Sequence, residues 1–467
     1  MALAPFVPLA AQNAPLSSAD SQLVAAVLLA ENRRDSSASS FRSALAHADP
    51  RVQLLARRAL GRIRDPLFAS RDALPPVAPA PTWPEPAWRL RYRALAITSP
   101  CTPLEAALAD SAWPVRLRAA DLSTRCAAHA PLVAQLNRWV DSLPRNTARR
   151  VAGGVSWHPG AHALVALASL DAPAARRAVT RHRAHGEPAV RQAVARAARV
   201  LADSTTLRRL AADKDPNVQE TAIDLLSALA GHGADDAYLA ALATPHAQAA
   251  RAAAVALKGS TNPAAAAAAR RALAVWTQAG NASARDVRVA LLEVLGQPAA
   301  ADQPPPNRYD LPPDAVRLAL GADVRLRVSL AAESGGGSFV VRLRGDLAPI
   351  MAAEILALVH QHYYDGLTWH RVEHDFVIQG GSPGANEYVG FARYLRDELA
   401  TLPHPRGTVG MSTRGHDTGD AQWFVNLKDN ARLLRDYTIF AEVVDGIEVV
   451  DGVLEGDRIS RITVEPR

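Results

Sequence analysis

Two hydrophobic periodicities divide this chain of 467 residues. From about residue 17 to residue 296 apolar residues recur every three or four positions, which predicts amphipathic helices. Beyond residue 320 the pattern changes to alternation in segments 324–331 and 338–346, which flank a Gly-rich turn and predict a β-hairpin. Segment 348–366 again has a helical pattern, with proline in its first turn. A long helical part is therefore expected before a β-rich part.

The helical part repeats a short motif, in which a proline or small residue is followed by V-R-x-x-A-x-x-A-L or a variant of it. Pro188, Pro216 and Pro245 are 28 and then 29 residues apart. Proline is tolerated in the first turn of a helix, and a helix pair of this length cannot bury its apolar stripe without a neighbour. Six copies resemble HEAT-type repeats, and the resemblance implies a stacked α-solenoid. The copies are Asp49–Ile63, Ser111–Leu122, Gly186–Leu201, Lys214–Leu229, Thr244–Leu257 and Ala284–Gly296.

Two proline-rich segments interrupt the periodic pattern. Segment 74–88, LPPVAPAPTWPEPAW, cannot be helical, and we expect an extended connector along the solenoid surface. Segment 297–314 is expected to be a semi-rigid linker between domains, because its prolines favour polyproline II.

Composition and charge narrow the classes of function. Residues 1–300 carry a net charge of +13 and residues 301–467 a net charge of −7. This asymmetry is typical of a surface for nucleic acid, anionic lipid or an acidic protein, or simply of solvated helix faces. We expect no nucleic-acid role, since no recognition motif or aromatic interleaving accompanies the basic residues. No apolar run long enough to predict a membrane span is present.

The two cysteines and the N-terminus bear on the compartment. Cys101 and Cys126 lie on neighbouring predicted helices and could either pair or be buried as free thiols. Residues 1–16 look like the apolar part of a secretory signal without its basic leader, or like a disordered tail. We expect export, to the periplasm of a bacterium, with the cytoplasm as the alternative.

The segment Thr368–Gly384, TWHRVEHDFVIQGGSPG, contains the most specific motif of the chain. It resembles the catalytic segment of the cyclophilins, in which F-H-R is followed a few residues later by Q-G-G. A second match runs through Gly407–Leu427 and Tyr437–Asp451. The resemblance covers about residues 322–467 and implies an eight-stranded antiparallel β barrel with flanking helices. It also implies peptidyl-prolyl cis/trans isomerase activity without a cofactor or a metal.

The resemblance also implies roles for individual residues. Arg371 matches the catalytic arginine, and Gln379 matches the glutamine that bonds both this arginine and the substrate backbone. The other matching positions are expected to bind substrate, and they are Phe376, Val377, Ser412, Gln422, Phe424, Leu433 and Tyr437. His370, His374, His404 and His416 lack the spacing of metal ligands, so we expect no metal site.

The expected architecture is therefore multidomain. Residues 1–16 form a signal or tail, residues 17–296 an all-α HEAT-like solenoid, residues 297–314 the linker and residues 315–467 the cyclophilin-like β barrel. We expect a protein-folding isomerase, or chaperone, that acts on proline-containing clients and carries a protein partner on its solenoid. The alternative is a scaffold or assembly factor that binds proline-containing segments without catalysing isomerisation.

Overall fold

The computed structural model describes residues 17–65, 78–143, 157–279, 284–302 and 310–466. The expected signal or tail, residues 1–16, and residues 303–309 of the expected linker lie outside these residues. Helices occupy the N-terminal part and an antiparallel sheet the C-terminal part, as the two periodicities predict. Within the described residues, none of the helices has the length and apolar character needed to cross a membrane.

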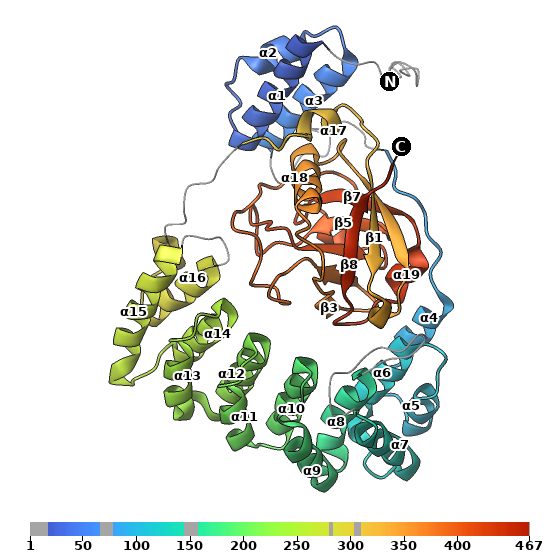
Figure 1. Cartoon of the computed structure of the whole chain (residues 1–467), viewed down its shortest axis with the longest axis vertical. Coiled ribbons are helices and arrows are strands. Elements are labelled where there is room, and N and C mark those ends of the chain that lie inside the picture. Colours follow the sequence, from blue (N-terminus) through green and yellow to red (C-terminus); the bar gives the residue numbers. More distant parts are fainter. Residues whose placement is uncertain (1–16, 66–77, 144–156, 280–283, 303–309, 467) are drawn as a thin grey trace.

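Three short helices open the described chain: α1 (Ser18–Arg33), α2 (Ser40–Leu45) and α3 (Pro50–Arg64). The Asp49 side chain accepts a hydrogen bond from the backbone N–H of Arg51, which caps α3 in front of its first-turn proline. The apolar face of these helices joins the hydrophobic core of the C-terminal domain. Arg62 ties them to it by donating to the carbonyl oxygen of Leu399 over 2.7 Å. In Figure 1 they lie against α17 (Ala315–Ala319), on the opposite side of the C-terminal domain from the helices that follow them in the N-terminal part.

The remaining helices form a curved row, the helical arc, which runs below the C-terminal domain in Figure 1. Helices α6, α8, α10, α12, α14 and α16 pack against one another in that order, and one continuous apolar core runs from Leu95 to Leu291. Proline begins several of them, and the Asp215 side chain caps α12 by accepting from the N–H groups of Asn217 and Val218. The arc contains α4 (Ala87–Ala94), α5 (Cys101–Ala107), α6 (Trp113–Leu122), α7 (Ala130–Asp141), α8 (His158–Leu170), α9 (Ala172–His182), α10 (Pro188–Val200), α11 (Ser204–Leu210), α12 (Pro216–Ala230), α13 (Asp235–Ala241), α14 (Ala247–Leu257), α15 (Pro263–Ala279) and α16 (Ala284–Val294).

The C-terminal domain is a curled antiparallel sheet of eight strands in the order β3-β4-β6-β5-β7-β2-β1-β8. The predicted hairpin is confirmed as β1 paired with β2. The predicted helix after it is also confirmed, although it ends at His360 rather than near residue 366. The strands are β1 (Arg325–Leu330), β2 (Ser338–Leu343), β3 (Arg371–Val372), β4 (Val377–Gly380), β5 (Thr408–Met411), β6 (Trp423–Asn426), β7 (Ile439–Asp445) and β8 (Ile459–Val464), and the helices are α17 (Ala315–Ala319), α18 (Pro349–His360) and α19 (Ile447–Asp451).

Residues 78–88 of the proline-rich connector are described, and residues 78–86 are extended as predicted, whereas Ala87 and Trp88 begin α4, contrary to the prediction. The extended part runs along the C-terminal domain rather than along the helical arc. Trp83 donates its indole N–H to the carbonyl oxygen of Val443, and Arg344 donates to that of Ala78. The expected position along the solenoid is therefore wrong. Prolines leave backbone carbonyls free along this segment, and arginine side chains of the domain use them as acceptors.

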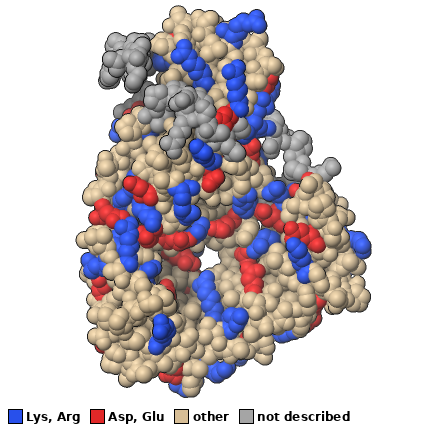
Figure 2. Space-filling view, turned by 180° about the vertical axis from the view of Figure 1, so that it is seen from behind, with Lys and Arg blue, Asp and Glu red and all other residues tan. Residues whose placement is uncertain are grey.

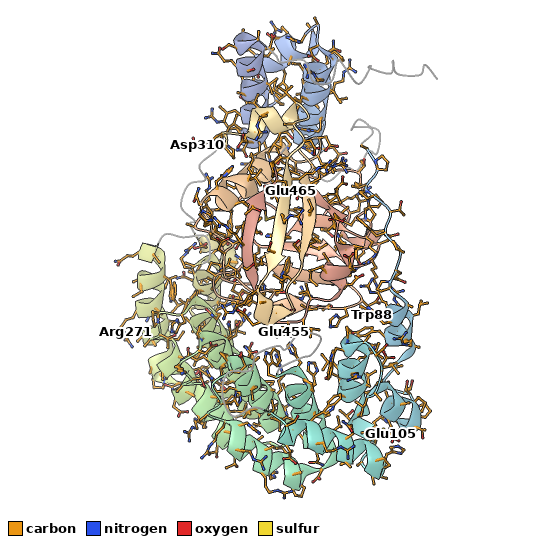
Figure 3. All side chains as sticks on the ribbon, turned by 45° about the vertical axis from the view of Figure 1, so that its right-hand side comes forward. Trp88, Glu105, Arg271, Asp310, Glu455 and Glu465 are labelled. Atoms are coloured by element: carbon orange, nitrogen blue, oxygen red, sulfur yellow. A yellow bond between two sulfur atoms is a disulfide. The ribbon has the colours of Figure 1, made fainter. Side chains whose placement is uncertain are left out.

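The helical arc meets the C-terminal domain again beyond this connector. His158 of α8 bonds the carbonyl oxygen of Glu455 over 2.8 Å. In Figure 3, Glu455 lies at the end of the domain nearest the arc. Trp88 of α4 packs on His374 of the domain, with ring centroids 6.0 Å apart. Figure 2 shows a hollow between the arc and the domain, with acidic and basic side chains on its rim.

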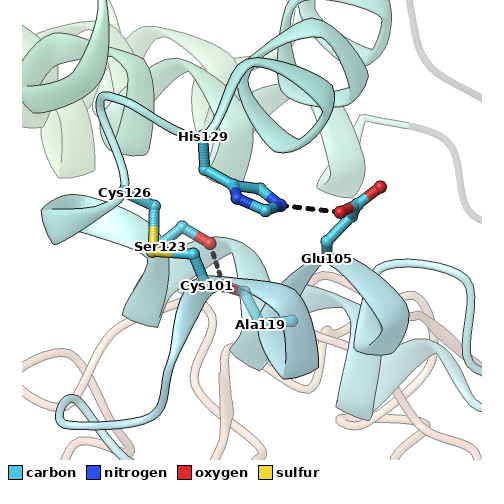
Figure 4. Close-up of a disulfide and its surroundings, with 6 residues drawn as sticks. All are labelled: Cys101, Glu105, Ala119, Ser123, Cys126 and His129. Atoms are coloured by element: carbon cyan, nitrogen blue, oxygen red, sulfur yellow. Dashed lines mark hydrogen bonds and ion pairs between the residues drawn. A yellow bond between two sulfur atoms is a disulfide. The ribbon is translucent and has the colours of Figure 1, made fainter.

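A disulfide between Cys101 and Cys126 settles the question that the sequence leaves open. It joins the start of α5 to the end of the short helix η3 (Ser123–Arg125), with the two Cα atoms 5.7 Å apart (Figure 4). Nearby, His129 bonds Glu105 over 2.7 Å. The disulfide therefore cross-links two neighbouring segments near the start of the arc.

Candidate active site

Strand register brings the central polar residues of the site together. Arg371 of β3 lies directly opposite Gln379 of β4, and Gln379 lies directly opposite Phe424 of β6. Cross-strand neighbours of this kind have side chains close enough to interact. Residues far apart in the sequence therefore meet in one row across the sheet.

These residues border a pocket with a cavity volume of about 140 Å³. Eight of the nine residues predicted for the site line it, and Gln422 lies behind it. The lining consists of Arg371, Phe376, Val377, Gln379, Glu387, Ser412, Thr413, Arg414, Phe424, Leu433 and Tyr437.

The floor of the pocket is apolar. Val377, Phe424 and Leu433 are buried together, apart from the main core, and Phe376 and Tyr437 pack against them. The Phe424 ring passes over Gly410, where an added Cβ would come within 2.4 Å of the ring. Glycine at position 410 is therefore what allows the ring to lie at the bottom of the pocket.

Arg371 and Gln379 form the polar edge of the pocket. The Nη1 atom of Arg371 donates to Oε1 of Gln379 over 3.3 Å. Gln379, which is only 3% exposed, donates from its amide nitrogen to Ser412 Oγ over 2.9 Å and to Gln422 Oε1 over 3.4 Å. This chain of bonds fixes the amide so that its oxygen faces the guanidinium.

Comparison with known proteins identifies this domain. The family described as cyclophilin type peptidyl-prolyl cis-trans isomerase/CLD matches residues 327–465. A peptidyl-prolyl cis-trans isomerase of Helicobacter pylori is 32% identical over 130 residues, which are 27% of this chain and 80% of that protein. Peptidyl-prolyl cis-trans isomerase B of Bacillus subtilis is 32% identical over 132 residues, 28% of this chain and 92% of that protein. This chain belongs to the cyclophilin-type isomerase family.

Its C-terminal domain is thus a peptidyl-prolyl cis-trans isomerase domain, called the cyclophilin domain below. Among solved structures, a cyclophilin type isomerase of Cryptosporidium parvum aligns with this chain at 23% identity and a TM-score of 0.29. The alignment covers 31% of this chain and 99% of the Cryptosporidium parvum chain. The helices before residue 327 lie outside the segment that the family matches.

Two carboxylates flank the arginine of the cyclophilin domain. Arg371 Nε donates to Oε1 of Glu373 over 2.9 Å, and Nη2 contacts the same oxygen. Nη1 donates to Oε1 of Glu387 over 3.0 Å as well as to Gln379. Four of the five N–H groups of the guanidinium are therefore engaged. The Arg371 side chain is still 38% exposed, so it remains accessible from the pocket.

Arg414 forms the wall of the pocket beside Glu387, and its charge is neutralised from two domains. Its guanidinium lies 3.0 Å from Asp420 of the cyclophilin domain and 2.7 Å from Asp286 of α16. The two carboxylates raise the pKa of Arg414 further above its usual range, against the opposing effect of burial.

Burial keeps three histidines of the cyclophilin domain uncharged near neutral pH. Burial lowers the pKa of His370 to about 4, that of His374 to about 3 and that of His404 to about 4. His404 stacks on Phe424, with ring centroids 6.2 Å apart. His404 therefore supports the floor of the pocket. Among the described residues, no cluster of side chains is suited to hold a metal ion.

Sequence reasoning missed two residues of the lining: Glu387 and Arg414. Arg414 follows Ser412 and Thr413, which the resemblance places beside the substrate backbone, so its place at the site could have been read from proximity alone. Glu387 carries no such signal, because it lies in a loop eight residues beyond Gln379. Only the folded loop brings its carboxylate back to Arg371.

Proposed function

We propose that this protein catalyses cis/trans isomerisation of Xaa-Pro bonds in protein clients, with Arg371 stabilising the twisted prolyl amide. Isomerisation is slow because amide resonance imposes a barrier of about 18–20 kcal/mol. The reaction breaks no covalent bond, so it needs neither a nucleophile nor a cofactor. A catalyst has to bind the amide more tightly when it is twisted than when it is planar.

The observation that carries this proposal is the position of the Arg371–Gln379 pair above an apolar pocket floor. When the amide twists, the lone pair of the prolyl nitrogen leaves conjugation and can accept a hydrogen bond. A guanidinium N–H aimed at that nitrogen stabilises the twisted form selectively. Gln379 orients the guanidinium and offers a polar contact for the client backbone.

The other lining residues would hold the client. Phe376, Val377, Phe424, Leu433 and Tyr437 enclose a volume suited to a proline ring. Ser412 stands at the polar edge beside Gln379, where a client backbone would pass. Gln422 supports this edge from behind, since it bonds Gln379 and the carbonyl oxygens of residues 387 and 389.

An isomerisation assay on an Xaa-Pro peptide tests the assignment in the full chain. Arg371→Ala should lower kcat/KM by about 100-fold or more, the usual cost of removing one donor that acts in the transition state. Arg325→Ala is the matched control, because Arg325 is an exposed arginine of β1 that pairs with Asp323, outside the pocket lining. Equal activity of the Arg371→Ala variant and the parent would refute the role of Arg371.

A second candidate function is a scaffold that binds proline-containing segments without useful catalysis. The engagement of Arg371 by Glu373 and Glu387 favours it, since these carboxylates compete with a client for the same N–H groups. The same peptides separate the two functions. A scaffold would bind them in the pocket, with affinity sensitive to Phe424→Ala, while leaving their isomerisation rate unchanged.

For the helical arc we propose a HEAT-like solenoid that recruits a protein partner. The in-register repeats and the serial packing of α6 to α16 support it. Recruitment would raise the effective concentration of the isomerase at its target proline. If so, the full chain should accelerate proline-limited refolding of its own client, recovered by cross-linking, more than that of an unrelated protein.

We also propose that the protein works in an oxidising compartment, outside the cytoplasm. The Cys101–Cys126 disulfide supports this, because such bonds persist mainly in exported proteins. Thiol labelling of the protein in intact cells should find both cysteines blocked until a reductant is added. Free thiols in the native protein would favour the cytoplasm instead.

A further inference from the structure

A loop of the cyclophilin domain contacts both the arc and the pocket through three consecutive residues: Asn386, Glu387 and Tyr388. Asn386 and Tyr388 contact the arc, and Glu387 between them contacts Arg371. The Asn386 side chain also shapes this loop, because its Oδ1 accepts from the N–H groups of Tyr388 (2.8 Å) and Val389 (2.9 Å). A displacement of either outer residue would therefore move Glu387.

The first contact with the arc is made by Asn217, in the first turn of α12. Its amide nitrogen donates to the carbonyl oxygen of Gly384 over 2.9 Å, and its Oδ1 accepts from Asn386 Nδ2 over 3.0 Å. Gln248 of α14 donates to the same oxygen over 3.2 Å and so holds Asn217 from behind. These paired amides fix the loop on the end of α12.

The second contact is made by Arg251 of α14, whose guanidinium carbon lies 3.8 Å from the centre of the Tyr388 ring. Glu220 of α12 holds this guanidinium in an ion pair of 2.8 Å, in which both side chains are largely buried. A guanidinium fixed in this way presents its face to the ring and restrains it. Two helices of the arc therefore hold both neighbours of Glu387.

The backbone of Glu387 is fixed as well. Its carbonyl oxygen accepts from Gln422 Nε2 over 3.2 Å and from Arg414 Nη1. Arg414 in turn pairs with Asp286 of α16. The backbone of Glu387 and both of its neighbours are therefore held in place. Its carboxylate is the group that contacts Arg371.

We propose that Glu387 is a positioning residue for Arg371 and that the helical arc sets its place. The inference rests on the proposed function, because it takes Arg371 as the catalytic residue. A long, partly exposed arginine samples many rotamers, and a donor acts in the transition state only when it is held in place beforehand. Glu373 restrains one edge of the guanidinium and Glu387 the other. The arc thereby becomes part of the catalytic apparatus without contributing a residue to the pocket lining.

The test compares four forms of the full chain in the Xaa-Pro peptide assay: the parent, Asn217→Ala, Glu387→Gln and the double variant. Glu387→Gln should lower kcat roughly fivefold with KM little changed, because it removes one ion pair that orients Arg371. Asn217→Ala should lower kcat in the same way. The double variant should be no slower than Glu387→Gln alone, since the arc acts through that carboxylate.

Arg208→Ala is the matched control on the arc, because it removes an exposed ion pair of α11 with Asp236, away from the loop. It should leave kcat unchanged. If Asn217→Ala unfolds in a thermal melt, Arg251→Lys replaces it, since lysine keeps the charge beside Glu220 but loses the planar contact with Tyr388.

Three results would overturn the inference. One is a kcat of the Asn217→Ala variant equal to that of the parent. Another is a double variant whose loss equals the product of the two single losses. The third is a Glu387→Gln variant faster than the parent, which would make Glu387 a competitor of the client. Each applies when Arg371→Ala lowers activity as expected. If Arg371→Ala leaves activity intact, it is the proposed function that fails.

Discussion

Arg89 of α4 is the most deeply buried link between the helical arc and the cyclophilin domain, and its removal gives a quantitative test of their docking. Its side chain has no exposed surface. It donates to the carbonyl oxygens of His374 (2.9 Å) and Leu427 (2.7 Å) and to Oδ1 of Asp451 (2.9 Å). Arg89→Ala removes all three bonds at once.

The loss of folding free energy caused by Arg89→Ala depends on which hydrogen-bond donors remain at each of the three acceptors. Removing one partner of a buried ion pair usually costs about 3–5 kcal/mol, because a charge is left without compensation. Here Arg406 still donates to Asp451 over 2.7 Å and to the carbonyl of Leu427 over 2.8 Å. His374 has no such second donor at its carbonyl among the hydrogen bonds of the described residues. We therefore expect the low end of this range, about 3 kcal/mol in the free energy of unfolding.

Urea denaturation of the full chain measures this loss. The matched control is Arg91→Ala, two residues along the same helix, where an exposed arginine pairs with Asp110 inside the arc. Both variants make the same chemical change in α4, but only Arg89 crosses to the cyclophilin domain. Arg91→Ala should hardly move the denaturation midpoint. Equal losses of stability in the two variants would refute the reasoning that burial and cross-domain bonding set the cost.

Two further predictions concern stability. Reduction of the Cys101–Cys126 bond, which spans 25 residues, should lower the free energy of unfolding by about 3.5 kcal/mol through loop entropy, and a Cys-free variant should not respond to reductant in urea denaturation. Burial, with Glu31 nearby, raises the pKa of Glu398 from 4.5 to about 7. The folded state then binds the proton more tightly, so stability should fall from pH 4.5 to pH 7. Thermal melts of Glu398→Gln should lack this part of the slope; an unchanged slope would contradict the assignment.

The elements of the cyclophilin domain could be predicted because its signals are local. Alternation marks β1 and β2, and a contiguous motif contains Arg371, Phe376 and Gln379. Their convergence with Phe424 required the resemblance, since sequence alone does not say which strands pair. Once the strands are paired, register brings the side chains together with no further information.

The docking of the helices could not be predicted, because the apolar stripe of α3 has the same form as the later repeat copies. Val52 and Leu55 look as if they face a neighbouring repeat, but they belong to a core that α1 to α3 share with the C-terminal domain. Periodicity shows that a face is buried and not what covers it. Arg89 and Glu387 were missed for a related reason. Single polar contacts between distant segments leave no periodic trace.

The burial of α1 to α3 against the C-terminal domain has a consequence for synthesis. About 250 residues separate Arg64 from Ala315, which the ribosome adds at about 5–20 residues per second. For tens of seconds these three helices can pack only against one another, while the arc, whose contacts are mainly between successive helices, can already form. The order of folding is then opposite to the order of emergence at this end of the chain: its first helices to be translated complete their packing last.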